Sequence, residues 1–238
     1  MSSKLTPNQK RIRRRLLTVA HNAHASHIGS ALSVIDIIDA VYEVKKKTEK
    51  FILSNGHSAS ALYVILEKFG YIPEANLIDF ENHPNRDPRI GIDLSTGSLG
   101  QGLPIACGMA IADRKKKLYC LISDGECAEG SIWEALRIIH DLKIKNLILI
   151  VSVNGWGAYD PIDPSTLEKR LKGFGFHIVK IDGHNPKQVK QALKTDFPRL
   201  SIIMAATNSE QLSFLTGQDA HYYVMNDENY NLAMKLLK

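Results

Sequence analysis

The sequence of 238 residues contains no run of 18 apolar residues, so it predicts no transmembrane helix. Its three cysteines, Cys107, Cys120 and Cys127, have no metal-ligand spacing and form no even disulfide set, which favours a reducing cytoplasm. The first fifteen residues lack an apolar segment, so secretion is not expected. No repeat, low-complexity tract or Pro/Gly/Ser linker is present. With 44% hydrophobic and 23% charged residues, the sequence predicts one folded domain over 1–238.

The net charge of +5 raises the question of a nucleic-acid partner. The basic residues fall in short runs at 11–15, 45–47 and 114–117, and no aromatic residues are interleaved with them as a stacking surface would require. We therefore interpret these runs as solvated helix ends and loops, and expect neither nucleic acid nor a membrane as a partner.

Hydrophobic periodicity predicts alternating helices and strands. Thr6 and Pro7 are typical of a helix start, and Ser33 with Asp36 resembles a capping box before another helix. Nearly continuous apolar runs predict strands buried on both faces at 51–53, 118–122, 146–153, 177–181 and 201–205. Helical patterns lie between and after them at 59–69, 100–113, 132–142, 166–173, 186–193 and 229–237. This order predicts an α/β fold in which helices sandwich a mostly parallel β-sheet.

In such a fold ligands bind at the carboxyl ends of the strands. Asp124 follows one predicted strand and Asn154 follows the next, so the two should share one edge of the sheet. A carboxylate, an amide oxygen and a nearby carbonyl suit magnesium that shares its shell with phosphates. Two ordinary turns would give the same spacing.

The segment 95–102 contains three glycines, which let the backbone approach a ligand before a helix starts. It matches neither a Walker A loop nor the G-x-G-x-x-G dinucleotide pattern. Four histidines, His27, His57, His83 and His221, stand beside turn residues and predict a polar pocket, although a single histidine is more often structural. His21, His24 and His27 are spaced as a metal-binding stripe would be, but a helix end is expected to interrupt them.

These motifs together resemble the N-terminal, diphosphate-binding domain of transketolase, a thiamine-diphosphate enzyme. The resemblance runs from about residue 13 to about residue 222. The landmarks in order are SHIGS at 26–30, FILSNGH at 51–57, His83-Pro84, LSTGSLGQGL at 94–103, SDGECAEGSIWEA at 123–135, and Asn154.

The resemblance implies a role for each matching position. The metal ligands would be Asp124, Asn154 and the carbonyl of Trp156, for Mg²⁺ or Ca²⁺ or Mn²⁺ in its place. Further cofactor contacts would come from His57, Gly97, Ser98, Leu99, Gly125 and Glu126. His27, His57, His83 and His221 would be active-site histidines, and Glu129 and Glu134 would belong to a proton relay at a subunit interface. From the residues alone, the two glutamates are also explained as charges that complement a helix dipole.

The activity implied is transfer of a two-carbon ketol unit between sugars or sugar phosphates, with the cofactor supplying the difficult chemistry. In the family a glutamate on a second, pyrimidine-binding domain activates the cofactor, and little chain remains after residue 222 for such a domain. The resemblance therefore implies a split transketolase that works in the cytoplasm with a separate pyrimidine-domain partner chain, as an α2β2 heterotetramer.

The sequence departs from the family pattern at Ser123, where glycine is usual, at Val153, in a shorter connection at 45–50 and in the segment 208–211, which indicates a specialised substrate. Two alternatives remain open: another carboligase or acyloin-forming enzyme that uses the same cofactor, and a degenerate, non-catalytic scaffold.

Overall fold

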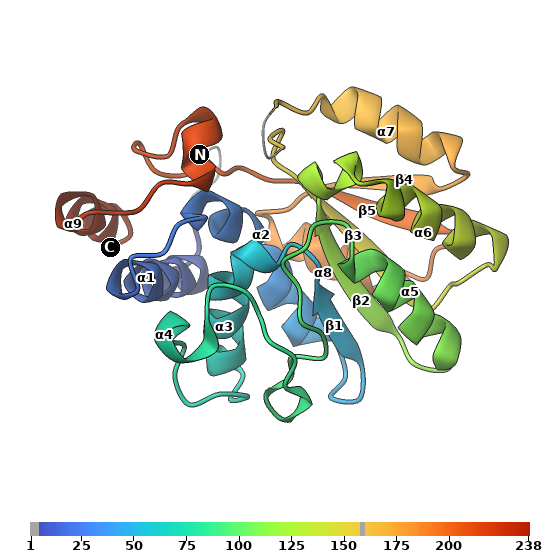
Figure 1. Ribbon diagram of the computed structural model, residues 1–238, viewed down its shortest axis with the longest axis horizontal. Helices are drawn as coiled ribbons and strands as arrows, with labels where there is room; N and C mark the ends of the chain where they lie inside the picture. The colour runs from blue at the N-terminus through green and yellow to red at the C-terminus, as the bar shows by residue number, and fades with distance from the viewer. Residues whose placement is uncertain (1–4, 158–159) are drawn as a thin grey trace.

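The computed structural model describes residues 5–157 and 160–238. Five parallel strands form one sheet in the order β1-β2-β3-β5-β4 (Figure 1). Their bounds are β1 (Lys50–Leu53), β2 (Leu118–Ser123), β3 (Leu147–Val153), β4 (His177–Asp182) and β5 (Ser201–Ala206). All five predicted strands and the predicted parallel arrangement are confirmed.

Helices cover both faces of the sheet, as Figure 1 shows. One face is covered by α2 (Ile28–Val44), α3 (Ala59–Lys68) and α8 (Pro186–Lys194), and α1 (Pro7–Asn22) packs on α2 and α3 away from the sheet; the other face packs against α5 (Gly102–Ala112), α6 (Gly130–Asp141) and α7 (Pro164–Gly173). The short α4 (Leu77–Phe80), which was not predicted, and the C-terminal α9 (Asp227–Leu236) complete the α-helices of the described residues.

Successive residues of a strand point to opposite faces, so each strand contributes to both layers. In β2, Tyr119 and Leu121 pack in the core with α2, whereas Cys120 and Ile122 pack with α5 and α6. All four side chains are buried. Double burial of this kind explains why β1, β2, β3 and β5 read as apolar runs. The prediction of burial on both faces is wrong for β4, which lies at an edge of the sheet and has exposed side chains at His177, Lys180 and Asp182.

The first helix begins as predicted and the second does not. Thr6 accepts a hydrogen bond from the backbone N–H of Gln9, and the Gln9 side chain accepts from the N–H of Thr6, so α1 has a full capping box. The capping box expected at Ser33 and Asp36 is wrong, because α2 already begins at Ile28. Inside that helix Ser33 donates back to the carbonyl of Gly29 at 2.9 Å.

The basic run of α1 is not fully exposed, which corrects its interpretation as a solvated helix end or loop. Arg13 is buried with only 1% of its side chain exposed, and it pairs with the equally buried Asp36. Arg15 is half-buried and donates to Glu67 at 2.8 Å. Two of the arginines therefore stabilise the packing of α1 against α2 and α3.

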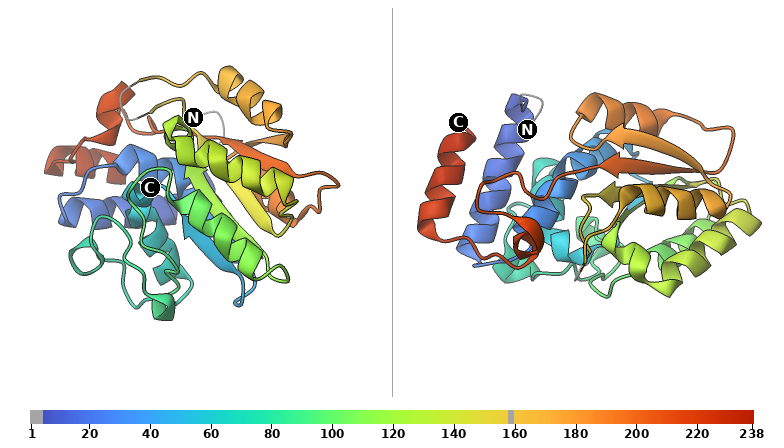
Figure 2. Two further views of the ribbon diagram at one scale, coloured as in Figure 1. Left: turned by 45° about the vertical axis from the view of Figure 1, so that its right-hand side comes forward. Right: turned by 90° about the horizontal axis from the view of Figure 1, so that it is seen from above.

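Helices α1 and α9 lie side by side, so that the two ends of the described chain meet on one side of the molecule (Figure 2). His21, on the last turn of α1, contacts Asp227 of α9 at 2.9 Å. Across residues 5–157 and 160–238, no helix is both long enough and apolar enough to span a membrane.

Candidate functional site

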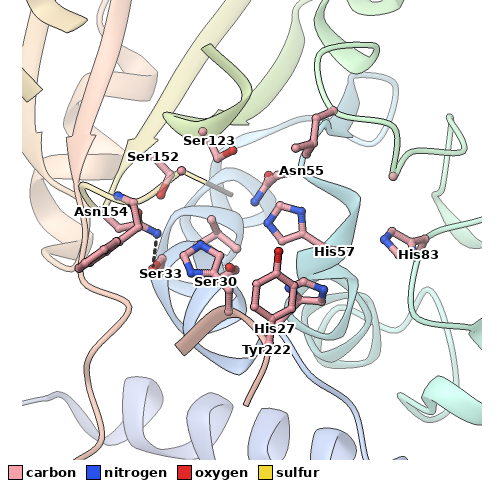
Figure 3. A pocket seen from close by; sticks show the side chains of 17 residues that line it. His27, Ser30, Ser33, Asn55, His57, His83, Ser123, Ser152, Asn154 and Tyr222 are labelled. Atoms are coloured by element: carbon pink, nitrogen blue, oxygen red, sulfur yellow. Dashed lines mark hydrogen bonds between the residues drawn. The ribbon is translucent and has the colours of Figure 1, made fainter. Parts of the chain in front are cut away.

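A pocket of about 200 Å³ opens at the carboxyl edge of the sheet (Figure 3). The start of α2 forms one wall, the ends of β1, β2 and β3 form the floor, and the loops before α5 and after β5 close the sides. The lining residues are His27, Ser30, Ser33, Val34, Asn55, His57, His83, Gly97, Leu99, Ser123, Gly125, Ser152, Asn154, Trp156, Gly157, His221 and Tyr222. Four of these are the histidines that the sequence singled out.

Asp124 and the turn at 154–157 are joined directly. One carboxylate oxygen of Asp124 accepts from the N–H of Gly155 at 2.8 Å, and the other accepts from the N–H of Gly125 at 3.1 Å. Asn154 is oriented by the turn, because its Oδ1 accepts from the N–H of Trp156 at 2.9 Å. The carbonyl oxygen of Trp156 lies 3.6 Å from the position a Cβ would take on Gly125. The structure thus brings the three predicted metal ligands together.

The donor set suits a hard cation. Asp124 is 1% exposed, and no cationic side chain of residues 5–157 or 160–238 forms an ion pair with it. Burial raises the pKa of Asp124 to about 7, although backbone N–H groups, that of Gly155 foremost, oppose the shift. A buried carboxylate without a cation beside it costs free energy, and a bound divalent ion offsets this cost. The site therefore fits Mg²⁺.

A stripe of three histidines does not form a second metal site. α1 ends at Asn22, and both His24 and His27 have left-handed backbone conformations beyond its end. His21 instead faces α9. No group of three His, Cys, Asp or Glu side chains that could hold a metal exists within the described parts of the chain. Of the predicted ligands at the Asp124 site, Asp124 belongs to these four residue types, and the other two are the side-chain amide of Asn154 and the backbone carbonyl of Trp156.

The pocket histidines form a cluster. The rings of His27 and His57 have their centroids 5.1 Å apart, and Tyr222 lies 5.8 Å from His27 (Figure 3). The Nδ1 atom of His27 is buried and has no hydrogen-bond partner within the described structure. Such an atom is available to a ligand.

These rings are neutral near pH 7. Burial is the main cause that lowers the pKa of His27 to about 4 and that of His57 to about 3, and neighbouring histidines such as His221 and His83 add to both shifts. A neutral imidazole has one donor and one acceptor nitrogen. Each ring can therefore donate to an oxygen or accept from a hydroxyl group.

Close protein neighbours give a further reason for glycine in the 95–102 loop. A Cβ on Gly97, which has φ +149°, would lie 2.8 Å from the ring of His83. A Cβ on Gly102 would lie 2.4 Å from the hydroxyl oxygen of Ser54. The backbone still lines the pocket at Gly97 and Leu99, whereas Ser98 does not.

Glu126 supports the pocket from behind instead of lining it. Its carboxylate is fully buried and accepts three hydrogen bonds, from the hydroxyl of Ser54 at 2.6 Å, the N–H of Gly100 at 3.0 Å and the N–H of Ser123 at 3.1 Å. These contacts fasten the glycine loop to the ends of β1 and β2. The predicted direct contact of Glu126 with a cofactor is therefore replaced by a positioning role.

Glu129 and Glu134 are exposed and lie outside the pocket. Glu134 pairs with Arg137 at 2.6 Å on the outer side of α6. Glu129 lies at the rim, since a Cβ on Gly100 would be 2.5 Å from its Cβ. Neither is placed to act on a ligand from within this chain alone.

Several lining residues were not singled out from the sequence. Ser30 and Asn55 are buried, and each has an oxygen without a hydrogen-bond partner in the described structure. Ser30 and Ser33 follow His27 at helical spacing, a polar stripe on an otherwise apolar helix that could have indicated them. Asn55 and Ser152 come from strand ends next to predicted site residues.

The parallel sheet, the buried carboxylate and the histidine pocket define an α/β protein with a site for a metal-bound anionic ligand. Residues 8–208 match the family described as "Transketolase, thiamine diphosphate binding domain". The chain belongs to this family.

Relatives of two lengths match the chain. One of the subunits of an apulose-4-phosphate transketolase, from Actinobacillus succinogenes, is 31% identical, over 98% of this chain and 96% of its own length. The "6-deoxy-6-sulfo-D-fructose transketolase subunit SqwG" of Clostridium sp. is 32% identical, over 89% of this chain and 88% of its own. The "Transketolase" of Pongo abelii is 36% identical over 67% of this chain, but the match spans only 28% of that longer protein.

The fold agrees with a solved transketolase. The structure from Campylobacter jejuni superposes on all of this chain with a TM-score of 0.84 at 24% identity, and the match covers 43% of that chain. The predicted α/β sandwich and the predicted family are thus both confirmed.

Proposed function

We propose that this chain is the diphosphate- and metal-binding subunit of a split transketolase, which moves a two-carbon ketol unit between sugars or sugar phosphates in the cytoplasm. The relatives that match over nearly their whole length are named transketolase subunits, which supports this proposal. The one observation that carries it is the buried carboxylate of Asp124, which pairs with no cationic side chain of the described residues and is joined by a hydrogen bond to the turn that holds Asn154.

Each site residue then has a role. Asp124, Asn154 and the carbonyl of Trp156 would hold Mg²⁺, and the backbone of Gly125 would contact the diphosphate. Gly97 and Leu99 form the wall for the aminopyrimidine. When bound, thiamine diphosphate supplies the nucleophilic carbon on which the two-carbon unit is carried.

The histidines bind oxygen atoms and move protons. His27 and His57 lie side by side in the pocket as neutral rings, so each can donate to an oxygen that gains negative charge or accept a hydrogen bond from a hydroxyl group. His83 and His221 extend this set on the sides of the pocket. We assign them to the substrate carbonyl and hydroxyl groups.

Activity is expected only with a second chain that carries the pyrimidine domain, and the outer face of α5 supports this proposal. α5 is apolar around its circumference, yet Ile105 and Ile111 are 41% and 39% exposed, and Gly108 is exposed between them. A helix that is apolar all round is normally buried. α5 begins at the end of the pocket loop, so a partner chain seated there would also reach the rim at Glu129.

Asp124→Asn tests the metal site in the assembled complex. We expect the Mg²⁺-dependent affinity for thiamine diphosphate to fall at least 100-fold, and two-carbon transfer to fall with it, because a charged ligand of the ion is lost. Isothermal titration of the cofactor and a ketose-donor assay measure both effects. Asp196→Asn, on an exposed carboxylate, is the matched control. Unchanged cofactor affinity in Asp124→Asn would disprove the metal assignment.

Gly108→Trp tests the partner face. A bulky side chain at this exposed helix position should block assembly while leaving the chain folded. Apart from the two chain neighbours of Gly108 and the backbone of its own helix, no heavy atom of the described residues lies within 4 Å of the added Cβ. Gly173→Trp is the control, since Gly173 is equally open but lies on α7. Co-purification and light scattering report assembly. Equal assembly of both variants would exclude the α5 face as the interface with the partner chain.

A further inference from the structure

The segment after β5 carries two pocket residues, His221 and Tyr222, and has little regular structure to hold them. From residue 207 to residue 222 it contains one short 3₁₀ turn, Gly217–His221. Leu212 and Leu215 anchor it in the core beside α2. We call residues 207–222 the pocket arm. Without a helix or strand, the position of the pocket arm depends on individual contacts.

Gln211 supplies three of those contacts. Its Oε1 accepts from the Nε of Arg13 at 2.9 Å. Its Nε2 donates to the carbonyl oxygens of Leu32 and Asn208, each at 2.9 Å. One side chain therefore connects the pocket arm with α1 and α2.

Arg13 is itself held rigidly. Its Nη1 donates to Oδ1 of Asp36 at 2.8 Å and to the carbonyl of Gln9 at 3.3 Å, and both Arg13 and Asp36 side chains are 1% exposed. A paired guanidinium and carboxylate with two parallel hydrogen bonds have a fixed mutual geometry. Gln211 thus contacts a guanidinium group that is buried and already held by Asp36 and Gln9.

The same ion pair reaches the pocket arm by a second route. His184 lies in the turn after β4. Its Nδ1 is 2.8 Å from Oδ2 of Asp36, and its Nε2 accepts a hydrogen bond from the backbone N–H of Asn208 at 3.0 Å. Because Nε2 is the acceptor, Nδ1 carries the proton and donates to Asp36. Two separate side chains therefore tie the start of the pocket arm to the Arg13–Asp36 pair.

Both ends of the pocket arm lie against the start of α2 with little clearance. The carbonyl oxygens of Ser209 and Ala220 are both 3.0 Å from the position of a Cβ on Gly29. The N–H of His27 donates to the carbonyl of His221 at 2.9 Å. A small displacement of the pocket arm would therefore move His221 relative to His27.

We propose that Gln211 is a positioning residue, which transfers the fixed geometry of the buried Arg13–Asp36 pair to the pocket arm and so places His221 and Tyr222 beside His27. The catalytic part of this inference rests on the proposed function. The structural part does not, because it can be measured without any turnover.

Trp156 offers a local reporter. Its indole ring lies 3.7–3.8 Å from the position of a Cβ on Gly217, in the middle of the pocket arm. The chain has two tryptophans. In a Trp133→Phe background, fluorescence therefore reports on Trp156 alone, and displacement of the pocket arm should expose its ring to water.

The test uses Gln211→Ala and Gln211→Glu in the full-length Trp133→Phe chain. The first removes all three contacts. The second keeps an acceptor for Arg13 but places carboxylate oxygens against the carbonyls of Leu32 and Asn208. We expect both to shift Trp156 emission to the red and to speed amide hydrogen exchange about tenfold in residues 207–222, with the strands unchanged. Gln191→Ala, exposed on α8, is the matched control.

In the complex with its partner, both variants should lower kcat about tenfold while the affinity for Mg²⁺ and thiamine diphosphate stays within twofold, because Asp124 and Asn154 are untouched. Unchanged emission and exchange in both variants would overturn the proposal. Faster exchange in the strands as well as in the pocket arm would also overturn it, because it would show that Gln211 stabilises the whole chain and does not act on the pocket arm in particular. If the parent complex shows no ketol transfer, the proposed function fails but the emission and exchange results still decide the positioning role.

Discussion

The backbone N–H of His27 donates a hydrogen bond to the carbonyl oxygen of His221, with 2.9 Å between the two atoms. The two residues stand near opposite ends of the chain, one before α2 and the other after β5. His27 has φ +62°, a conformation that is costly for a residue with a Cβ. The strained N-terminal cap of α2 and the pocket arm thus hold each other in place at the pocket wall.

His27→Asn separates the structural and the chemical contributions of this residue. Asparagine tolerates the left-handed conformation, so the melting temperature should change by no more than about 2 °C. Turnover should fall about 100-fold, with a much smaller effect on cofactor affinity, because the imidazole that exchanges protons is lost. Steady-state kinetics and thermal unfolding measure these effects. An unfolded variant would show that His27 is mainly structural.

Acid should destabilise the folded chain through His57. Its pKa is lowered to about 3 in the fold by burial, whereas an unfolded histidine titrates near 6.5, so the unfolded state binds the proton more readily between these values. The free energy of unfolding therefore falls as the pH drops below about 6.5.

Uptake of about one proton by His57 on unfolding makes the free energy of unfolding fall by about 1.4 kcal/mol for each pH unit between pH 6 and pH 4. His57→Gln should remove this contribution. Urea unfolding at a series of pH values gives the slope. His177→Gln, on an exposed strand position, is the control. Parallel pH profiles for His57→Gln and the parent would contradict the prediction.

Glu126→Ala should destabilise the chain by about 3 kcal/mol or more. The substitution leaves the hydroxyl of Ser54 and the N–H groups of Gly100 and Ser123 without their acceptor in a buried place, and each such loss costs about 1–3 kcal/mol. Chemical denaturation measures the change. Glu228→Ala, at an exposed position in α9, serves for comparison. A difference below about 1 kcal/mol would mean that the glycine loop is held by other contacts.

The buried pair of Arg13 and Asp36 should show strong coupling. Arg13→Met or Asp36→Leu alone leaves one buried charge unpaired and should cost about 3–5 kcal/mol. The double variant should cost clearly less than the sum, because it leaves neither charge behind. A double-mutant cycle from urea unfolding measures the coupling. Additive effects would show that the two side chains contribute independently.

The sequence predicted the elements well because their signals are local. Most strands of the sheet appear as short apolar runs, although β4 carries polar residues, and Thr6 with Pro7 marks the start of α1. The prediction failed at Ser33 and Asp36, where a capping pattern lies inside a helix. Their side chains are used by a backbone carbonyl and by Arg13, and neither partner is visible in a local pattern.

The candidate site likewise contains residues that local motifs indicated and residues that they did not. Asp124 and Asn154 were singled out because they follow strands, where a parallel sheet places its ligands, and the four histidines because they stand beside turn residues. The positioning role of Glu126 was not found, because its three donors come from the ends of β1 and β2 and from the glycine loop. The reason for a glycine at position 102 was not found either, because the side chain that needs the space, Ser54, is distant in the sequence.

The sequence by itself therefore determined the order of strands and helices, the parallel sheet and the family, since periodicity and short motifs are properties of neighbouring residues. Only the tertiary structure decided which side chains meet across the chain: Arg13 with Asp36 and Gln211, and His27 with His221. Such contacts depend on the packing of the whole core, in which many small burial and entropy terms nearly cancel, and no local pattern records that balance.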